Sequence, residues 1–195
     1  MRQVFTIIIL LNFTIYLYGQ HSNTNKVKNN LINYNIPITK LVDSLKIIPA
    51  NTHILILKKQ YKLFVVKDTL ILKSYPVVFG FNPTDDKLRE GDGCTPEGKF
   101  KIRAKYPHKS WSKFIWIDYP NETSRKKHNN AVQKGIIPHD SNIGGEIGIH
   151  GVPAGADIII DEKNNWTLGC ISLKNKDIDE LYNFITLDMI IEIIK

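Results

Sequence analysis

Short apolar runs separated by polar turns dominate the sequence from residue 52 onward. The segment 52–80 alternates β-branched runs with polar residues, a pattern that predicts two or three antiparallel strands in a meander. Apolar residues at helical spacing predict helices in 37–48 and 175–185, while 122–135 fits a short helix or an exposed loop. Further strands are predicted in 98–107, 112–120, 145–151, 167–173 and 188–195. The pattern therefore predicts one domain that is mainly β with a few helices.

The first residues differ in composition from the rest of the chain. Arg2 gives a short basic start, residues 4–18 are almost wholly apolar, and Gly19 is a small residue ahead of a polar segment. This layout is typical of a secretory signal peptide (1–19), and the apolar stretch is short for a membrane span of about 20 residues. A signal anchor is the alternative. We therefore expect an exported protein of the periplasm or cell envelope, without stable membrane insertion after cleavage.

Residues 20–36 are rich in Asn and Lys and lack periodicity. Such a composition predicts a flexible lead, so that the lead and a short helix together occupy 20–50. The folded domain is then expected to occupy 51–195.

The chain carries 26 Lys and Arg against 19 Asp and Glu, a formal net charge of +7 at pH 7. The basic residues are scattered, and the longest cluster, 124–130, contains no aromatic residue. Because sites for single-stranded nucleic acid combine basic grooves with aromatic side chains, no nucleic-acid partner is expected. An exported basic protein is instead attracted to anionic cell-wall polymers.

Candidate chemistry lies in two strand-like segments, "GEIGIHG" (145–151) and "TLGCISL" (167–173). With a period of two, the isoleucines of the first segment share one face, so His150 projects from the other. The same reasoning places Cys170 and Ser172 opposite the apolar side chains of the second segment. A nucleophilic cysteine needs an imidazole within hydrogen-bond reach that keeps the thiol as a thiolate, with a pKa below about 8.5. Gly169 permits a sharp turn, and its amide and that of Cys170 can face a developing oxyanion.

Other readings of Cys170 remain open from the residue pattern alone. The thiol can be a small buried apolar group, or it can form a disulfide with Cys94, which an oxidising compartment would favour. A zinc site is not expected, because the sequence has no CxxC and no HxxxH pattern. We expect neither a metal nor a cofactor.

The linked motifs in 89–102 and 149–182 resemble the L,D-transpeptidase catalytic domain family, whose members remodel bacterial peptidoglycan. The family's nucleophile motif is Ser or Thr, any residue, Gly, Cys and an aliphatic residue, commonly followed by Arg and an aliphatic residue, with Asn and Asp after them. The segment "TLGCISL" matches it, and Asn175 and Asp177 match the Asn and Asp that follow. Its His-Gly pair matches His150 and Gly151, and its "TPxG" strand entry matches "TPEG" (95–98). The resemblance spans roughly residues 51–195 and implies a catalytic domain with a β-sandwich-like fold.

The resemblance also implies roles for particular residues. Cys170 is expected to be the nucleophile and His150 its base, with the imidazole oriented by the backbone carbonyl of Gly151. The amides of Gly169 and Cys170 are expected to hold the oxyanion.

Three further residues are expected at the substrate site. Trp166 lines the acceptor groove or wedges its loop against the core, and Thr167 hydrogen-bonds near the nucleophile or caps its loop. Ser172 stands where many relatives have an arginine that could grip a substrate carboxylate bidentately, which a serine cannot do. Cys94 is expected to lie too far from Cys170 to form a disulfide.

The implied reaction is acyl transfer within peptidoglycan. The thiolate attacks the carbonyl of the L-centre residue of a stem tetrapeptide, and an amine of a second stem peptide resolves the thioester. Water as the acceptor would instead give an L,D-carboxypeptidase, or an amidase that releases wall-attached protein. A non-catalytic peptidoglycan-binding domain is a further alternative. Peptidoglycan stem peptides are thus the expected partners, and no oligomeric state is predicted.

Overall fold

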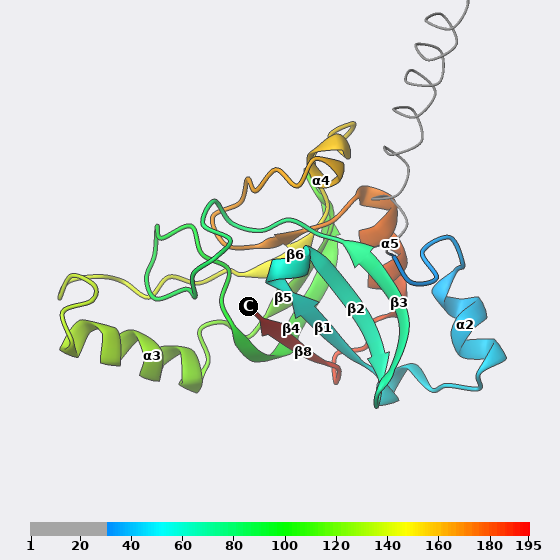
Figure 1. Ribbon diagram of the computed structural model, residues 1–195, viewed down its shortest axis with the longest axis horizontal. Coiled ribbons are helices and arrows are strands. Elements are labelled where there is room, and N and C mark those ends of the chain that lie inside the picture. Colours follow the sequence, from blue (N-terminus) through cyan, green and yellow to red (C-terminus); the bar gives the residue numbers. More distant parts are fainter. Residues whose placement is uncertain (1–30) are drawn as a thin grey trace, which may run out of the picture. The chain divides into compact units, whose positions relative to one another are not determined.

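The computed structural model describes residues 31–195, which contain a mixed eight-stranded sheet of strand order β3-β2-β1-β8-β4-β5-β6-β7 (Figure 1). The first three strands form the antiparallel meander that the sequence predicts, and β8 pairs with β1 in parallel. The strands are β1 (His53–Leu57), β2 (Lys62–Lys67), β3 (Leu70–Pro76), β4 (Gly98–His108), β5 (Ser112–Ile117), β6 (Gly148–His150), β7 (Ile171–Ser172) and β8 (Ile190–Ile194).

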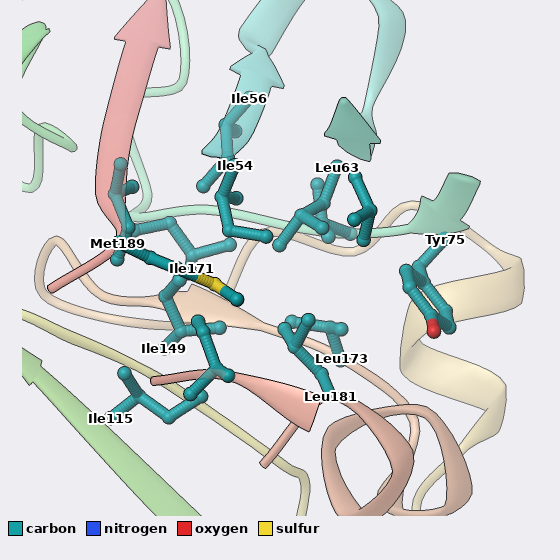
Figure 2. Close-up of a cluster of buried hydrophobic side chains, with 14 of the residues drawn as sticks. Ile54, Ile56, Leu63, Tyr75, Ile115, Ile149, Ile171, Leu173, Leu181 and Met189 are labelled. Carbon is teal, nitrogen blue, oxygen red and sulfur yellow. The ribbon is translucent and has the colours of Figure 1, made fainter. Parts of the chain in front are cut away.

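The long strand β4 joins the two halves of this sheet. Its residues 98–101 pair with β8, and its residues 102–108 pair with β5, with a register shift between Ile102 and Ala104. Side chains of both halves meet in one core, where Ile54 and Leu63 of the first half lie in the same cluster as Ile149 and Ile171 of the second (Figure 2). The predicted fold class is therefore confirmed, a mainly β, sandwich-like domain.

Helices pack on parts of this sheet and lie in the segments that connect its strands. Within the described part of the chain they are α2 (Ile38–Ser44), α3 (Glu122–Gln133), α4 (Ile158–Asp161) and α5 (Asn175–Phe184), with 3-10 turns at Pro49–Asn51 and Lys58–Gln60. The segment 122–135 is thus helical, and the side chain of Asn121 caps α3 by accepting a hydrogen bond from the Ser124 amide. Helix α5 packs on β5 and buries Ile178 and Leu181.

The structure differs from the sequence prediction just before α2. Residues 32–36 form turns that are packed on the domain, although their composition predicts a flexible lead. The Tyr34 hydroxyl donates to Asp177 on α5 at 2.8 Å, and the Lys73 ammonium donates to the Tyr34 carbonyl at 2.9 Å. Side-chain contacts from distant strands and helices, which local composition does not encode, order this segment. The proposed signal peptide, 1–19, lies outside the described residues, and within 31–195 no helix is long and apolar enough to cross a membrane.

Candidate active site

The candidate site lies where β6 and β7 pair. The two strands run parallel, with Ile149 opposite Ile171 and His150 opposite Ser172. Both isoleucines are fully buried in the core, as the period of two predicts. Cys170 is half-buried and immediately precedes β7, two residues before Ser172, the partner of His150. It therefore lies diagonally across from His150, on the side of the strand pair opposite the two isoleucines.

One hydrogen bond orients the His150 imidazole. Its Nδ1 lies 2.6 Å from the carbonyl oxygen of Gly151. Because a carbonyl can only accept, Nδ1 carries the hydrogen, and the basic lone pair of the neutral ring is on Nε2. The side chain is 1% exposed, so this tautomer is held in a closely packed environment.

Aromatic rings form that environment. The His150 ring stacks on Trp111 with centroids 4.4 Å apart and lies nearly parallel to Phe114 at 5.8 Å. Trp166 meets it edge-on at 5.6 Å. Sequence reasoning missed Trp111 and Phe114, because they reach the site through the pairing of β5 with β6, which no local pattern reveals.

This environment makes the imidazole a weak base. Burial lowers the pKa of His150 from 6.5 to about 4, and the hydrogen bond from Nδ1 to Gly151 offsets only part of that effect. His108, which stacks on Trp111 at 4.3 Å, adds a smaller lowering when it is charged. The resting imidazole is therefore neutral at pH 7.

The Cys170 thiol is also neutral at rest. Its Sγ lies 3.6 Å from the carbonyl oxygen of Glu146. Although part of the residue is accessible to solvent, protein atoms surround it closely, and this burial raises the pKa of the thiol from 9.0 to about 11. A hydrogen bond from the Gly148 amide lowers the pKa by a smaller amount. The structure thus differs from the thiolate that the sequence predicts, because desolvation outweighs the favourable contacts.

Alkylation of Cys170 should report this difference directly. In a Cys94→Ser background, the rate of reaction with iodoacetamide should rise with pH and reach half its maximum above pH 9.0, since only the thiolate reacts. The measurement is the rate of alkylation at each pH, with the modified protein quantified by mass spectrometry. A midpoint below about 8.5 would show instead that the free enzyme holds a thiolate–imidazolium pair.

Hydrogen bonds within the loop fix the turn that carries Cys170. The Thr167 hydroxyl donates to the carbonyl of Cys170 at 2.7 Å, and the Gly169 amide donates to the same hydroxyl oxygen at 3.2 Å. Thr167 is 6% exposed. Thr167 therefore hydrogen-bonds next to Cys170 and caps its loop, as the sequence predicts, and it engages one of the two amides assigned to the oxyanion.

Two other expected substrate contacts also have structural partners. Ser172 is fully buried, and its hydroxyl donates to the carbonyl of Gly151 at 3.2 Å. The hydroxyl therefore reaches the carbonyl that orients His150, and a contact between Ser172 and substrate stays a prediction. Trp166 packs against Val78 and neighbouring apolar side chains, the arrangement expected of a residue that wedges its loop against the core.

Cys94 lies beside the loop that carries Cys170 and forms no disulfide with it. A Cβ atom added to Gly169, whose φ is +143°, would stand 2.6 Å from the Cys94 carbonyl oxygen, so the two backbones are in close contact. The Cys94 thiol nevertheless turns toward the carbonyl of Asp92, at 3.4 Å, and both cysteines are free. Burial raises the pKa of the Cys94 thiol to about 11, which disfavours its oxidation.

Replacement of Cys94 should therefore leave the reaction unchanged. Cys94→Ser is expected to retain full activity, and the wild type should turn over equally fast with and without a mild reductant. The measurement is initial rate at matched protein concentration in both conditions. Activation of the wild type by reductant, absent in Cys94→Ser, would instead make the cysteine pair a redox switch.

Acidic residues of the loop that precedes β4 have structural partners. The carboxylate of Asp92 accepts hydrogen bonds from three backbone amides and from Lys87, and Asp86 pairs with Lys127. His139 is exposed on the loop after α3. Across residues 31–195, no group of three His, Cys, Asp or Glu side chains is placed to hold a metal ion.

Comparison with known proteins assigns the chain to a family. Residues 51–193 match the L,D-transpeptidase catalytic domain (YkuD) family. No curated protein sequence matches the chain.

The chain shares its fold with solved structures that include Bd1075 and Pgp2. Bd1075 of Bdellovibrio bacteriovorus is 22% identical with a TM-score of 0.52, and the match covers 74% of this chain and 48% of Bd1075. Pgp2 of Campylobacter jejuni, described as a helical cell shape determining protein, is 22% identical with a TM-score of 0.54, and the match covers 73% of this chain and 46% of Pgp2. The matched part is thus less than half the length of either protein.

Proposed function

We propose that this chain, which belongs to the L,D-transpeptidase catalytic domain family, is an exported cysteine acyltransferase that remodels peptidoglycan stem peptides. The observation that supports this most strongly is the pairing of β6 with β7. It places a partly accessible cysteine diagonally across from a histidine whose Nδ1 is occupied by the Gly151 carbonyl, so the basic nitrogen is Nε2. A cysteine nucleophile needs a base with this geometry and tautomer.

Acylation begins from the neutral pair. The Cys170 sulfur attacks the carbonyl carbon of the L-centre residue in a stem tetrapeptide, while the thiol proton passes to Nε2 of His150. Because the pKa of the thiol is raised and that of the imidazole is lowered, the proton moves as the carbon–sulfur bond forms and not before it. The Cys170 amide stabilises the oxyanion.

Collapse of the tetrahedral intermediate breaks the amide bond to the terminal D-residue. His150 returns the proton to the leaving amine, which leaves a thioester on Cys170. The amine of a second stem peptide then attacks the thioester, its proton passes through His150 to the departing sulfur, and the free thiol is restored. Atoms and charges balance in both halves without a cofactor.

Mass spectrometry of peptidoglycan fragments tests this proposal. Tetrapeptide fragments are incubated with the full chain and, in parallel, with Cys170→Ala. A cross-linked dimer that forms only with the wild type supports transpeptidation, whereas a shortened stem peptide or the release of attached protein assigns water as the acceptor. Fragments that bind but remain unchanged would contradict the enzymatic proposal and favour a binding domain.

A further inference from the structure

The peptide unit between Gly151 and Val152 is held at both ends by buried or half-buried side chains outside the proposed catalytic pair. From this we infer that Ser172 and Asn175 are positioning residues, which clamp this peptide and thereby fix the tautomer of His150. The inference rests on the proposed function for its kinetic part only.

Ser172 holds the carbonyl end. The Gly151 carbonyl oxygen accepts from His150 Nδ1 at 2.6 Å and from the Ser172 hydroxyl at 3.2 Å. A carbonyl oxygen has two lone pairs, so these two donors use both of them. The Ser172 hydroxyl fixes the direction in which the Gly151 carbonyl oxygen points. Because this oxygen faces Nδ1 of His150, Nδ1 is the ring nitrogen that must carry the hydrogen.

Ser172 is itself held rigidly. Its amide donates to the carbonyl of Val78 at 2.9 Å, and its carbonyl accepts from the Val78 amide at 3.0 Å. The residue is fully buried. Its hydroxyl therefore acts from a backbone that is hydrogen-bonded on both sides, within the strand that also begins next to Cys170.

Asn175 holds the amide end. The side-chain Oδ1 of Asn175, the first residue of α5, accepts a hydrogen bond from the Val152 amide at 3.1 Å. The backbone of Asn175 is fixed in turn, because its own amide donates to Asp157 at 3.0 Å. The end of a helix therefore anchors the same peptide unit that β7 holds from the other side.

The close fit of the clamp also explains why residue 151 has no side chain. A Cβ atom added to Gly151 would stand 2.2 Å from the Asn175 Oδ1 and 2.6 Å from the carbonyl oxygen of Trp111. The Gly151 amide donates to that same carbonyl at 2.9 Å. Any other residue would push the clamp away from the peptide whose carbonyl orients His150.

Nitrogen-15 NMR of histidine-labelled full-length protein tests the clamp without any substrate, with the His150 signals assigned by their loss in His150→Gln. The wild type should show the Nδ1–H tautomer at His150, and Ser172→Ala and Asn175→Ala should each raise the share of the Nε2–H form. The Nε2–H form cannot accept the thiol proton. The share of the Nδ1–H form should fall roughly tenfold, and kcat should fall by the same factor with KM unchanged. Asn175→Asp keeps the acceptor oxygen and should retain the Nδ1–H tautomer.

Ser74→Ala is the matched control for loss of a buried hydroxyl. Ser74 is fully buried on β3, and its hydroxyl oxygen accepts from the Ile32 amide at 2.7 Å, away from the site. This variant should leave both the tautomer and kcat unchanged. An unchanged tautomer in folded Ser172→Ala and Asn175→Ala would overturn the clamp. A shifted tautomer in a protein with no wild-type turnover would support the clamp and refute the proposed function alone.

Discussion

Cys170→Ala is expected to abolish turnover of stem peptides while the chain stays folded. Removal of the nucleophile leaves no atom to form the thioester, so the rate should fall roughly 10⁴-fold or more. The change removes a single sulfur atom from a half-buried position, so the free energy of unfolding should change by less than about 1 kcal/mol. The measurements are fragment turnover by mass spectrometry and urea unfolding.

Cys94→Ala is the matched control, since it removes the other free thiol of the chain, whose residue is 3% exposed. It should keep its turnover although it loses some stability, because its loss leaves a small gap in the packing. Wild-type turnover in Cys170→Ala would refute the assignment of the nucleophile. Loss of the folded state in that variant would show that Cys170 is a structural residue.

His150→Ala should produce the second largest effect. Without Nε2 as the base, kcat should fall by about 10²- to 10⁴-fold. The ring is 1% exposed among Trp111, Phe114 and Trp166, so its truncation also leaves a cavity that costs about 2–4 kcal/mol of stability. His150→Gln fills more of that cavity and separates the loss of the base from the loss of packing.

The pH profile of the wild type tests the same residue. The lowered pKa of His150 means that the base is neutral at pH 7 and becomes protonated only as the pH falls, so kcat/KM should drop to half near pH 4. A half-maximum near the ordinary histidine value of about 6.5 would contradict the desolvated imidazole. His139→Ala, at an exposed histidine, is the control and should leave the profile unchanged.

The periodicity of the sequence predicts the faces of the strands that carry the site. The alternation in "GEIGIHG" and "TLGCISL" places Ile149 and Ile171 in the core, where the structure has them. The position of His150 beside Gly151 likewise predicts the hydrogen bond to the Gly151 carbonyl, once the family resemblance is considered. These features depend on residues within a few positions of each other, so local sequence contains the information.

Local sequence does not predict the protonation states of His150 and Cys170. His150 and Cys170 alone suggest a thiolate–imidazolium pair, but three aromatic rings and the surrounding chain desolvate both groups. Trp111 and Phe114 belong to the segment that leads into and forms β5, whose pairing with β6 joins residues more than thirty positions apart. No local pattern specifies that pairing, and without it neither the stacking nor the shift in pKa can be predicted.

The roles of the polar residues divide in the same way. The sequence by itself determined the mainly β class, the faces of β6 and β7, and the cysteine and histidine that the family resemblance marks. Only the tertiary structure decided that the Ser172 hydroxyl hydrogen-bonds to the Gly151 carbonyl and the Thr167 hydroxyl to the Cys170 carbonyl, and that 32–36 packs on α5. The physical reason is that a polar side chain acts on whichever groups burial brings within hydrogen-bond distance, and those groups come from distant parts of the chain.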